Sequence, residues 1–464
     1  MTSLPAPRRA DTPPLPGKRT GRAAACAILE KVEVGGGSSN LLLAEMSGGE
    51  ERERHLATTL VYGVLRQRRA LDRLIEKASQ RPLAEIDPPV LIVARVALFQ
   101  ILFLTRVPRA AAVNEAVSLA RARRGRGAAA FTNAVLRTAC RLIDQGIGAG
   151  SLLPDEAVDP ALHLAEKHSF PPFLAGRFLA RHGREECEAL LETLNTPAPT
   201  VLRVTRRAGD GAATVGRLRE EGIETTPSPG LAGALRVVRG APQRTGLFRD
   251  GQVYVQDEAA QVVSLLLLPL DHPDGLLDLC TAPGGKLLMA AESLPPGARV
   301  VASDISMARL RLLEENARRL HVTGILRVAS DATRPALRAT FGRVLLDAPC
   351  TGTGIIRRHP EIRWRRSDAD VATAARAQAQ MLLRAADLVS PGGRLVYSVC
   401  SLEPEEGPER IDALLEARPD LSVVDARTIL PPALHRLIDR RGFLATLPHR
   451  DDMDGFFAAA LRRV

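Results

Sequence analysis

The chain has 464 residues, 45% of them hydrophobic and 25% charged, which is typical of a soluble globular protein of about two to four domains. Its formal net charge of +10 favours a polyanionic partner such as a nucleic acid. The six cysteines have neither Cys-x-x-Cys nor Cys/His ligand spacing, so we expect free thiols in a reducing cytoplasm, with no disulfide framework and no metal site.

The amino-terminal residues 1–21 are rich in Pro and Arg and lack an apolar stretch, which predicts a disordered basic arm rather than a secretory signal. From 22 to 145 the apolar residues recur at helical spacing, with a loop at 123–127, and this predicts an all-helical domain. No segment reaches the roughly 20 apolar residues that span a bilayer, so we expect no membrane role.

The next part of the chain changes character twice. Residues 146–160 contain Gly, Pro and acidic residues without periodicity and are interpreted as a linker. Residues 161–246 begin with a helical pattern and continue with two short alternating segments, 201–205 and 234–238, around a helix at 212–221. This pattern predicts a small α+β module.

Residues 247–464 alternate between short strand-like runs and helical runs, which predicts an α/β domain with a parallel, doubly wound sheet. The final apolar run, 456–461, is interpreted as an edge strand. The other strand-like runs are 276–280, 299–304, 325–328, 343–346 and 393–397. Ligands of such sheets bind outside the carboxyl ends of the strands, so the loops after these runs are the candidate site.

Two of these loops carry a thiol just after a strand. Cys350 ends the segment Asp-Ala-Pro-Cys, and Cys400 lies in Ser-Val-Cys-Ser. A single free cysteine is usually a small buried hydrophobic residue. Two thiols at two strand ends instead suggest covalent chemistry on a pyrimidine ring, because a thiolate adds to an electron-poor ring and leaves again readily.

A Gly-rich turn, Cys280 to Lys286, follows the first strand, and Asp304 ends the second. The Gly pair lets backbone N–H groups approach a ligand, and an acid at the second strand end is placed to bind the ribose hydroxyls of a nucleotide-bearing cofactor. A tight turn without a ligand is the alternative interpretation of Gly284 and Gly285.

Three segments in this order, Asp-x-Cys-x-Ala-Pro-Gly-Gly-Lys, Asp-Ala-Pro-Cys and Tyr-Ser-x-Cys-Ser, resemble the motifs of the S-adenosylmethionine-dependent RNA cytosine-C5 methyltransferases. The helical third resembles the RNA-binding fold of the antitermination protein NusB, through residues 60–66, 114–117 and 131–137. The combination is similar to the RsmB family, which acts on 16S ribosomal RNA. It implies a Rossmann-like methyltransferase domain, preceded by a NusB-like domain and the small α+β module.

The resemblance also implies residue roles. Cys400 is the expected nucleophile, and Cys350 the group that helps to release the product. A thiol otherwise titrates near about 8.5, so Cys400 needs local positive potential, which Lys286, nearby Arg side chains or the sulfonium of the cofactor could provide. Asp347 could donate a proton to the ring if burial raises its pKa. The residues expected to bind S-adenosylmethionine are Cys280, Thr281, Ala282, Pro283, Gly284, Gly285, Lys286, Asp304, Asp331 and Asp347.

The expected partner is 16S ribosomal RNA, free or in an assembling small subunit, bound by a monomeric protein. Two Arg-rich segments, 357–360 and 363–366, are candidates for phosphate contacts, and the single Trp364 for stacking on a base, although a packed Trp with a solvated Arg face explains them almost as well. Arg121, Arg123, Arg124 and Arg126 form a further candidate phosphate site, with a charged interhelical loop as its alternative.

Two alternative functions remain open from the sequence. The first is a cytosine-C5 methyltransferase of transfer RNA or DNA; in the DNA enzymes, however, the Pro-Cys thiol is the nucleophile, and the helical domain would not be expected. The second is a noncatalytic RNA-binding factor in which the sheet domain is only a scaffold. Cofactor binding and turnover distinguish an enzyme from such a factor.

Overall fold

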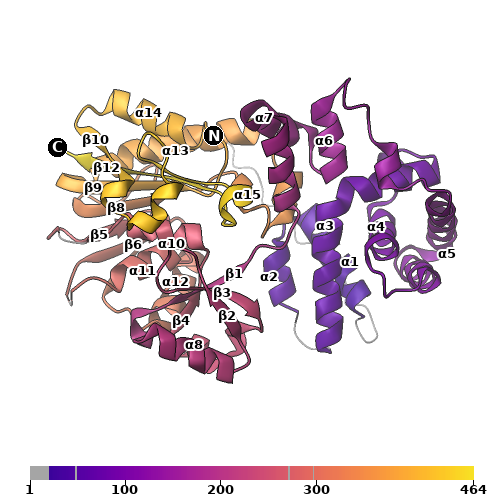
Figure 1. Cartoon of the computed structure of the whole chain (residues 1–464), viewed down its shortest axis with the longest axis horizontal. Helices are drawn as coiled ribbons and strands as arrows, with labels where there is room; N and C mark the ends of the chain where they lie inside the picture. The colour runs from indigo at the N-terminus through magenta and orange to yellow at the C-terminus, as the bar shows by residue number, and fades with distance from the viewer. Residues whose placement is uncertain (1–19, 47–49, 270–271, 296) are drawn as a thin grey trace. The chain divides into compact units, whose positions relative to one another are not determined.

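The computed structural model describes residues 20–46, 50–269, 272–295 and 297–464 (Figure 1). Nearly all of the predicted basic arm, residues 1–19, lies outside the described residues. The chain forms two compact units, the first ending at Pro172 and the second beginning at Phe173. Within the described ranges, no helix combines the length and the apolar character required to cross a membrane.

The first unit is entirely helical in its described part, as predicted. Its central helix, α4, is apolar on all sides and is covered by α1, α3 and α5. The one charge on α4 after its first turn, Arg95, is 2% exposed and lies between the carboxylates of Asp72 and Glu33. The helices are α1 Gly21–Gly35, α2 Ser39–Ala44, α3 Glu51–Ser79, α4 Pro88–Phe103, α5 Arg109–Asp144 and α6 Pro160–His168.

Helix α5 differs from the sequence prediction, which placed a loop at 123–127. The structure has a single non-helical residue there, Gly125, with φ +83°, and helix continues on both sides of it. Because glycine adopts positive φ without a steric cost, one residue is enough to kink the helix. The prediction of a full loop was therefore wrong.

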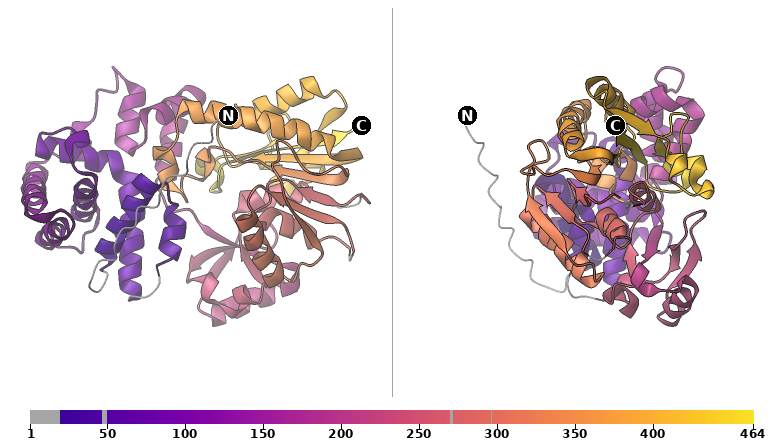
Figure 2. Two further views of the ribbon diagram at one scale, coloured as in Figure 1. Left: turned by 180° about the vertical axis from the view of Figure 1, so that it is seen from behind. Right: turned by 90° about the vertical axis from the view of Figure 1, so that its left-hand side faces the viewer.

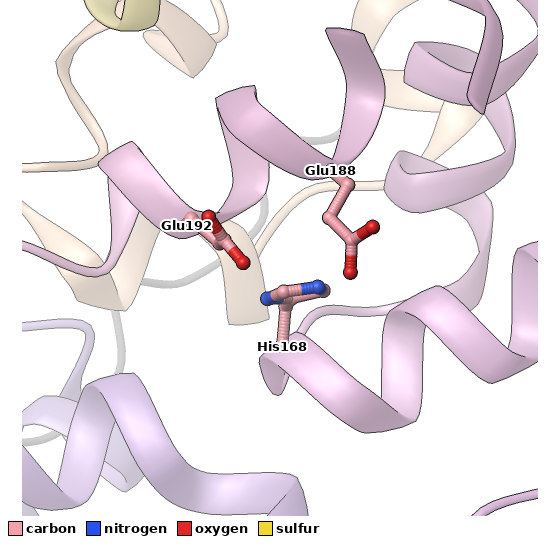
Figure 3. A group of neighbouring side chains, drawn as sticks. All are labelled: His168, Glu188 and Glu192. Carbon is pink, nitrogen blue, oxygen red and sulfur yellow. The ribbon is translucent and has the colours of Figure 1, made fainter. Parts of the chain in front are cut away.

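Helix α6 is anchored to the first unit by a buried acid. Glu166, on α6, is bonded to Arg69 and Arg73 of α3. The next helix, α7 Pro172–Leu194, belongs to the second unit from Phe173 onward. On it Glu188 and Glu192 lie one turn apart and project from the same side of the helix (Figure 3). The domain boundaries drawn from the sequence stay predictions.

The second unit contains a small antiparallel sheet of order β2-β3-β1-β4, with α8 packed beside it. Two of its strands, β2 and β4, are so short and so weakly alternating that the sequence did not predict them. Its core contains Leu202, Leu218 and Leu235. The elements are β1 Thr200–Val204, α8 Gly211–Glu220, β2 Glu224–Pro227, β3 Ala234–Arg239, α9 Gly246–Arg249 and β4 Val253–Val255.

The large sheet of the second unit has the order β10-β12-β9-β8-β5-β6-β7, with β11 paired to β12. The neighbours from β9 to β7 are parallel, as predicted. Strand bounds are β5 Leu276–Asp278, β6 Val300–Asp304, β7 Ile325–Ala329, β8 Phe341–Asp347, β9 Val389–Val399, β10 Leu421–Val424, β11 Leu444–Thr446 and β12 Phe456–Arg463.

Helices cover both faces of this sheet (Figures 1 and 2). Alternate strand residues supply the two cores; Leu345 joins one and its neighbour Leu346 the other. The first core packs against α10 Glu258–Leu265, α11 Gly285–Ala291 and α12 Met307–Arg319, and the second against α13 Asp368–Asp387 and α14 Pro408–Ala417. The predicted fold class, an all-α domain, a small α+β module and a Rossmann-like domain, is confirmed.

One strand prediction was wrong. The final strand, β12, is not at the edge but lies between β9 on one side and β10 and β11 on the other, and it is antiparallel to all three. Its first six residues are buried on both faces, which is the pattern of a central strand. The sheet is therefore mixed rather than parallel throughout.

We predict that Gly63→Ala weakens the helical unit. A Cβ on Gly63 of α3 would lie 2.0 Å from Cζ of Phe99 on α4, so the packed ring must shift. Such overpacking costs about 1–3 kcal/mol of unfolding free energy, which denaturant unfolding of the full chain would measure. Gly127→Ala is the control, since a Cβ at this helical position meets nothing within 4 Å. Equal stability of the two variants would contradict the packing argument.

Candidate active site

The residues predicted to form the site lie at one edge of the large sheet, at or just after the carboxyl ends of the five parallel strands. Asp347 ends β8 and is paired in register with Ser398 near the end of β9. Asp304 ends β6. The Gly-rich turn that begins at Cys280 follows β5. Because neighbouring parallel strands end at the same edge, residues far apart in the sequence are close in space.

The two cysteines meet at this edge. The Sγ atoms of Cys350 and Cys400 are 3.4 Å apart, within hydrogen-bonding distance for sulfur. Both side chains are partly buried. The hydrogen bond to the Cys400 sulfur, together with burial and the nearby negative charge of Cys400 and Glu406, raises the pKa of Cys350 well above its ordinary value. Cys350 is therefore harder to ionise than an ordinary cysteine.

The loops that carry the two thiols are bonded directly to each other. The Gly354 N–H donates to the Cys400 carbonyl at 3.1 Å, and the Leu402 N–H donates to the Thr353 hydroxyl at 2.9 Å. Gly354 also has no room for a side chain, because a Cβ there would lie 2.0 Å from the Gly455 carbonyl oxygen. The close approach of three backbone segments fixes the place of both cysteines.

Beside the thiols, Lys286 and Asp347 form an ion pair, with 2.7 Å between Nζ and Oδ2. The second oxygen of Asp347 accepts a hydrogen bond from the Ser398 hydroxyl at 2.7 Å. Burial lowers the pKa of Lys286, but the charge and hydrogen bond of Asp347 outweigh burial and raise it, with a further contribution from Cys400. Lys286 thus stays a cation close to Cys400. Ser398 was not predicted from the sequence, although it lies two residues before that thiol.

The carboxylate of Asp304 organises the Gly-rich turn from inside. It is 2% exposed and accepts from the backbone N–H of Ala282 at 3.3 Å and of Ser306 at 3.0 Å. Arg309 lies 3.5 Å from the same carboxylate and donates to the Ala282 carbonyl. Gly284 has φ +100°, a conformation that favours glycine. The turn is therefore held in one shape by its own neighbours.

The remaining residues predicted to bind the cofactor have different surroundings. Thr281 is buried and donates its N–H to the Ser303 carbonyl, and Pro283 is exposed. Burial, followed by the charges of Asp278, Asp347 and Asp304, raises the pKa of Cys280. Asp331 follows β7 and is exposed; its carboxylate accepts bonds from Thr333 and contacts none of the other predicted site residues in the described structure.

Asp278 begins the first of the three motifs, but no role was predicted for it from the sequence. It is fully buried at the end of β5, and burial, with the charge of Asp347, raises its pKa to about 7. It is thus a carboxyl group that changes charge near neutral pH at the centre of the site. Its place at the start of the motif was the available signal, but the pKa shift depends on surroundings that only the folded chain creates.

Most of the arginine side chains described in the segments after Cys350 bond other groups of the protein rather than facing solvent. Arg363 is 0% exposed and bonds Asn195 and the Leu194 carbonyl, and Arg357 is 5% exposed. Arg358 bonds the carboxylates of Asp257 and Asp454. These side chains are therefore occupied within the protein, so neither the predicted phosphate contacts nor a solvated Arg face describes them.

The Arg group of the helical unit is divided. Arg123 pairs with Glu30, and Arg124 pairs with Asp87. Arg121 and Arg126 are exposed. Two of the four arginines therefore remain candidates for contact with phosphate.

Comparison with known proteins identifies three segments. Residues 265–462 match the family described as 16S rRNA methyltransferase RsmB/F, and residues 19–141 match the NusB family. Residues 170–243 match the ferredoxin-like domain of RsmF/B-like methyltransferases. The matches follow the order of the helical unit, the small sheet and the large sheet.

Relatives match the whole chain. A probable ribosomal RNA small subunit methyltransferase B of Bacillus subtilis is 33% identical over 96% of this chain and 99% of its own length. Ribosomal RNA small subunit methyltransferase B of Vibrio cholerae is 33% identical over 95% of this chain and 96% of its own. The crystal structure of PH0851 shares the fold, with a TM-score of 0.78 at 24% identity over 96% of this chain and 99% of that chain.

Fold, site and matches together define an S-adenosylmethionine-dependent methyltransferase that acts on ribosomal RNA. The chain belongs to the RsmB/F family of 16S rRNA methyltransferases.

We predict that Asp278→Asn flattens the pH dependence of stability. The carboxyl titrates at about 7 in the folded protein and near about 3.9 when unfolded. Between these values the folded form holds a proton that the unfolded form releases, so stability falls as pH rises from about 4 to about 7. The variant should reduce this fall by up to about 4 kcal/mol, measured by denaturant unfolding at several pH values.

The control for this experiment is Asp250→Asn, which removes an exposed carboxylate from the same unit. Asp454, whose pKa burial likewise raises to about 7, titrates in all of the proteins and cancels in the comparison. An effect of equal size in the two variants would contradict the assignment to Asp278.

Proposed function

We propose that this protein methylates carbon 5 of a cytosine in 16S ribosomal RNA through a covalent bond between Cys400 and carbon 6 of the base. The observation that carries the proposal is the pair of sulfur atoms 3.4 Å apart at the ends of two adjacent parallel strands. Carbon 5 of cytosine is too electron-poor to attack a methyl sulfonium. A nucleophile that adds to carbon 6 makes carbon 5 electron-rich, and a thiolate suits this step.

The proposed steps conserve atoms and charge. The Cys400 thiolate forms the S–C6 bond, and the electron pair displaced from the ring double bond makes carbon 5 nucleophilic. S-adenosylmethionine would supply the methyl group: its S–CH₃ bond breaks as the bond to carbon 5 forms, and neutral S-adenosylhomocysteine is left. Once the S–C6 bond has consumed the Cys400 thiolate, the negative charge that helps to raise the Cys350 pKa is gone, and the Cys350 thiol can release its proton to solvent. The Cys350 sulfur, directly or through water, then takes the proton from carbon 5, and the S–C6 bond breaks to return the Cys400 thiolate.

The charged neighbours support this division of roles. Lys286 stays a cation beside Cys400 and favours its thiolate form. Both oxygens of Asp347 accept hydrogen bonds within the protein, one from Lys286 and one from Ser398. In this arrangement Asp347 orients Lys286 and is not free to bond the cytosine ring. An ion-paired carboxylate carries no proton of its own, so a proton that Asp347 gives to the ring would first have to come from the Lys286 ammonium at Oδ2.

The other half of the strand edge fits the methyl donor. Asp304 fixes the turn that starts at Cys280, and Asp331 leaves an exposed carboxylate at the next strand end. Just after Asp304, Ile305 and Met307 are 71% and 57% exposed, and a bound adenine would cover apolar side chains of this kind. These residues would hold S-adenosylmethionine with its sulfonium toward the thiols.

The proposed substrate is 16S ribosomal RNA in the cytoplasm, free or in an assembling small subunit, bound by a single copy of the chain. The family match and the NusB-like unit support this choice over transfer RNA. A noncatalytic RNA-binding role is the alternative, and it is disfavoured because the two thiols and the Lys286–Asp347 pair are all in place.

Loss of the nucleophile tests the reaction. We expect the intact chain to transfer labelled methyl from S-adenosylmethionine to unmodified 16S ribosomal RNA and to yield 5-methylcytidine. Cys400→Ala should reduce the rate by at least about 1,000-fold, because the sulfur proposed to add to carbon 6 is lost. Cys140→Ala, which removes a thiol of the other unit, is the control. Label undiminished in Cys400→Ala would overturn the role of that thiol, and label absent from every RNA nucleoside would favour the noncatalytic alternative.

Loss of the second thiol should stop the reaction at a later point. With Cys350→Ala, the S–C6 bond can form but its elimination is slowed. We expect a protein–RNA adduct that survives denaturing electrophoresis, and that is absent from Cys350→Ala/Cys400→Ala. An adduct that forms in Cys400→Ala instead would exchange the roles of the two cysteines.

A further inference from the structure

Two loops of the thiol site converge on a carboxylate that has not been given a role. Glu406, seven residues after β9 ends, is 0% exposed. Its Oε2 accepts from the Thr351 N–H and from the Gln378 amide, both at 2.9 Å. Its Oε1 accepts from the Ser401 hydroxyl at 2.8 Å and from the Thr351 hydroxyl. All the hydrogen-bond donors to this carboxylate within the described structure are neutral.

A second buried glutamate in the same loop, Glu403, is neutralised by ion pairs, unlike Glu406. Glu403 has a 0% exposed side chain, and two arginines of α7 share its carboxylate, Arg177 at 2.7 Å and Arg181 at 3.1 Å. Positive charge therefore balances Glu403. Glu406 has four hydrogen bonds instead, which satisfy its oxygens but leave a net negative charge inside the protein.

The bonds of Glu406 reach the residue that follows each thiol. Thr351 follows Cys350, and Ser401 follows Cys400, so a single carboxylate links both loops. The Gln378 amide extends the link, because it also donates to the Pro349 carbonyl at 3.0 Å. A change in this carboxylate would therefore alter the separation of the two sulfur atoms.

The charge of Glu406 acts on Cys350 in particular. Negative charge from Glu406 adds to the effects of the Cys400 hydrogen bond and of burial in raising the pKa of Cys350. Other titratable or charged groups around the two thiols include Tyr397 on β9 with Arg410 near it, and Lys286 with Asp347 and Asp278 on the Cys400 side. They also include Arg366, whose Nε donates to the Thr351 carbonyl.

We propose that Glu406 is a positioning residue of the thiol site, whose buried charge and hydrogen bonds keep Cys350 protonated and close to Cys400. In this arrangement Cys350 donates its S–H to the Cys400 sulfur, and Cys400 is the sulfur that attacks the base. The catalytic roles given to the two thiols rest on the proposed function. The protonation of Cys350 does not, since the titration of a thiol can be followed without RNA or methyl donor.

The variant Glu406→Gln removes the charge with little change of shape. Its amide oxygen can accept from Thr351 N–H and Gln378, while its NH₂ group donates to the two hydroxyl oxygens, so the network can persist. In protein labelled with [3-¹³C]cysteine, the Cβ shift of Cys350 reports its titration. We expect the midpoint to fall by about one pH unit or more. Glu409→Gln, which removes an exposed carboxylate nearby, should leave the midpoint unchanged.

Two further measurements separate this role from simple loss of structure. Glu406→Asp keeps the charge, so its Cys350 midpoint should return toward that of the intact chain even where the shorter side chain slows methyl transfer. In Glu406→Gln we expect kcat on 16S ribosomal RNA to fall by about 10-fold or more with KM within about twofold. An equal loss of fold in both variants is excluded by comparing their thermal unfolding.

The outcomes distinguish the two proposals. An unchanged Cys350 midpoint in a folded Glu406→Gln protein that retains normal kcat would overturn the role of Glu406 and leave the methyltransferase proposal intact. A shifted midpoint in a chain that methylates no RNA would support Glu406 as the group that sets the protonation of Cys350 and would overturn the proposed reaction.

Discussion

The parallel pairing of β8 with β9 is the constraint on which the active site depends. Asp347 and Ser398 are partners in this pairing, so the loops that follow both strands start from the same level of the sheet. Cys350 and Cys400 are fifty residues apart in the sequence, yet their sulfur atoms meet at 3.4 Å. A shift of register would separate the thiols and also break the bond between Ser398 and Asp347. The hydrogen-bonded backbone thus provides the precision that flexible loops lack.

Around this framework, buried charges divide into two groups. Arg95, Glu403 and Glu166 are balanced by opposite charges and hold elements together. Asp278 and Glu406 lie at the thiol site without an ion-pair partner among the described residues. Unbalanced charge in the interior is costly unless hydrogen bonds satisfy it, and its concentration near two thiols is consistent with a site that controls protons.

The sequence predicted much of the site because the residues that carry the chemistry lie in short, recognisable segments. A thiol directly after a buried strand, a Gly pair after another, and an acid at a third strand end were visible without any structure, and the fold gathers these segments at one edge. The prediction was poorer where a residue acts through its surroundings. Arg357 and Arg363 looked like RNA contacts because their charge was visible, but their burial and bonding partners were not.

The sequence by itself determined the fold class, the order of the three parts and the family, because apolar periodicity and short motifs are local properties of the chain. It also identified both thiols. Only the tertiary structure decided that β12 is a central antiparallel strand, that Gly125 kinks one helix rather than opening a loop, and that Asp278, Ser398 and Glu406 belong to the site. Strand order and burial arise from contacts between distant segments, and no local pattern encodes them.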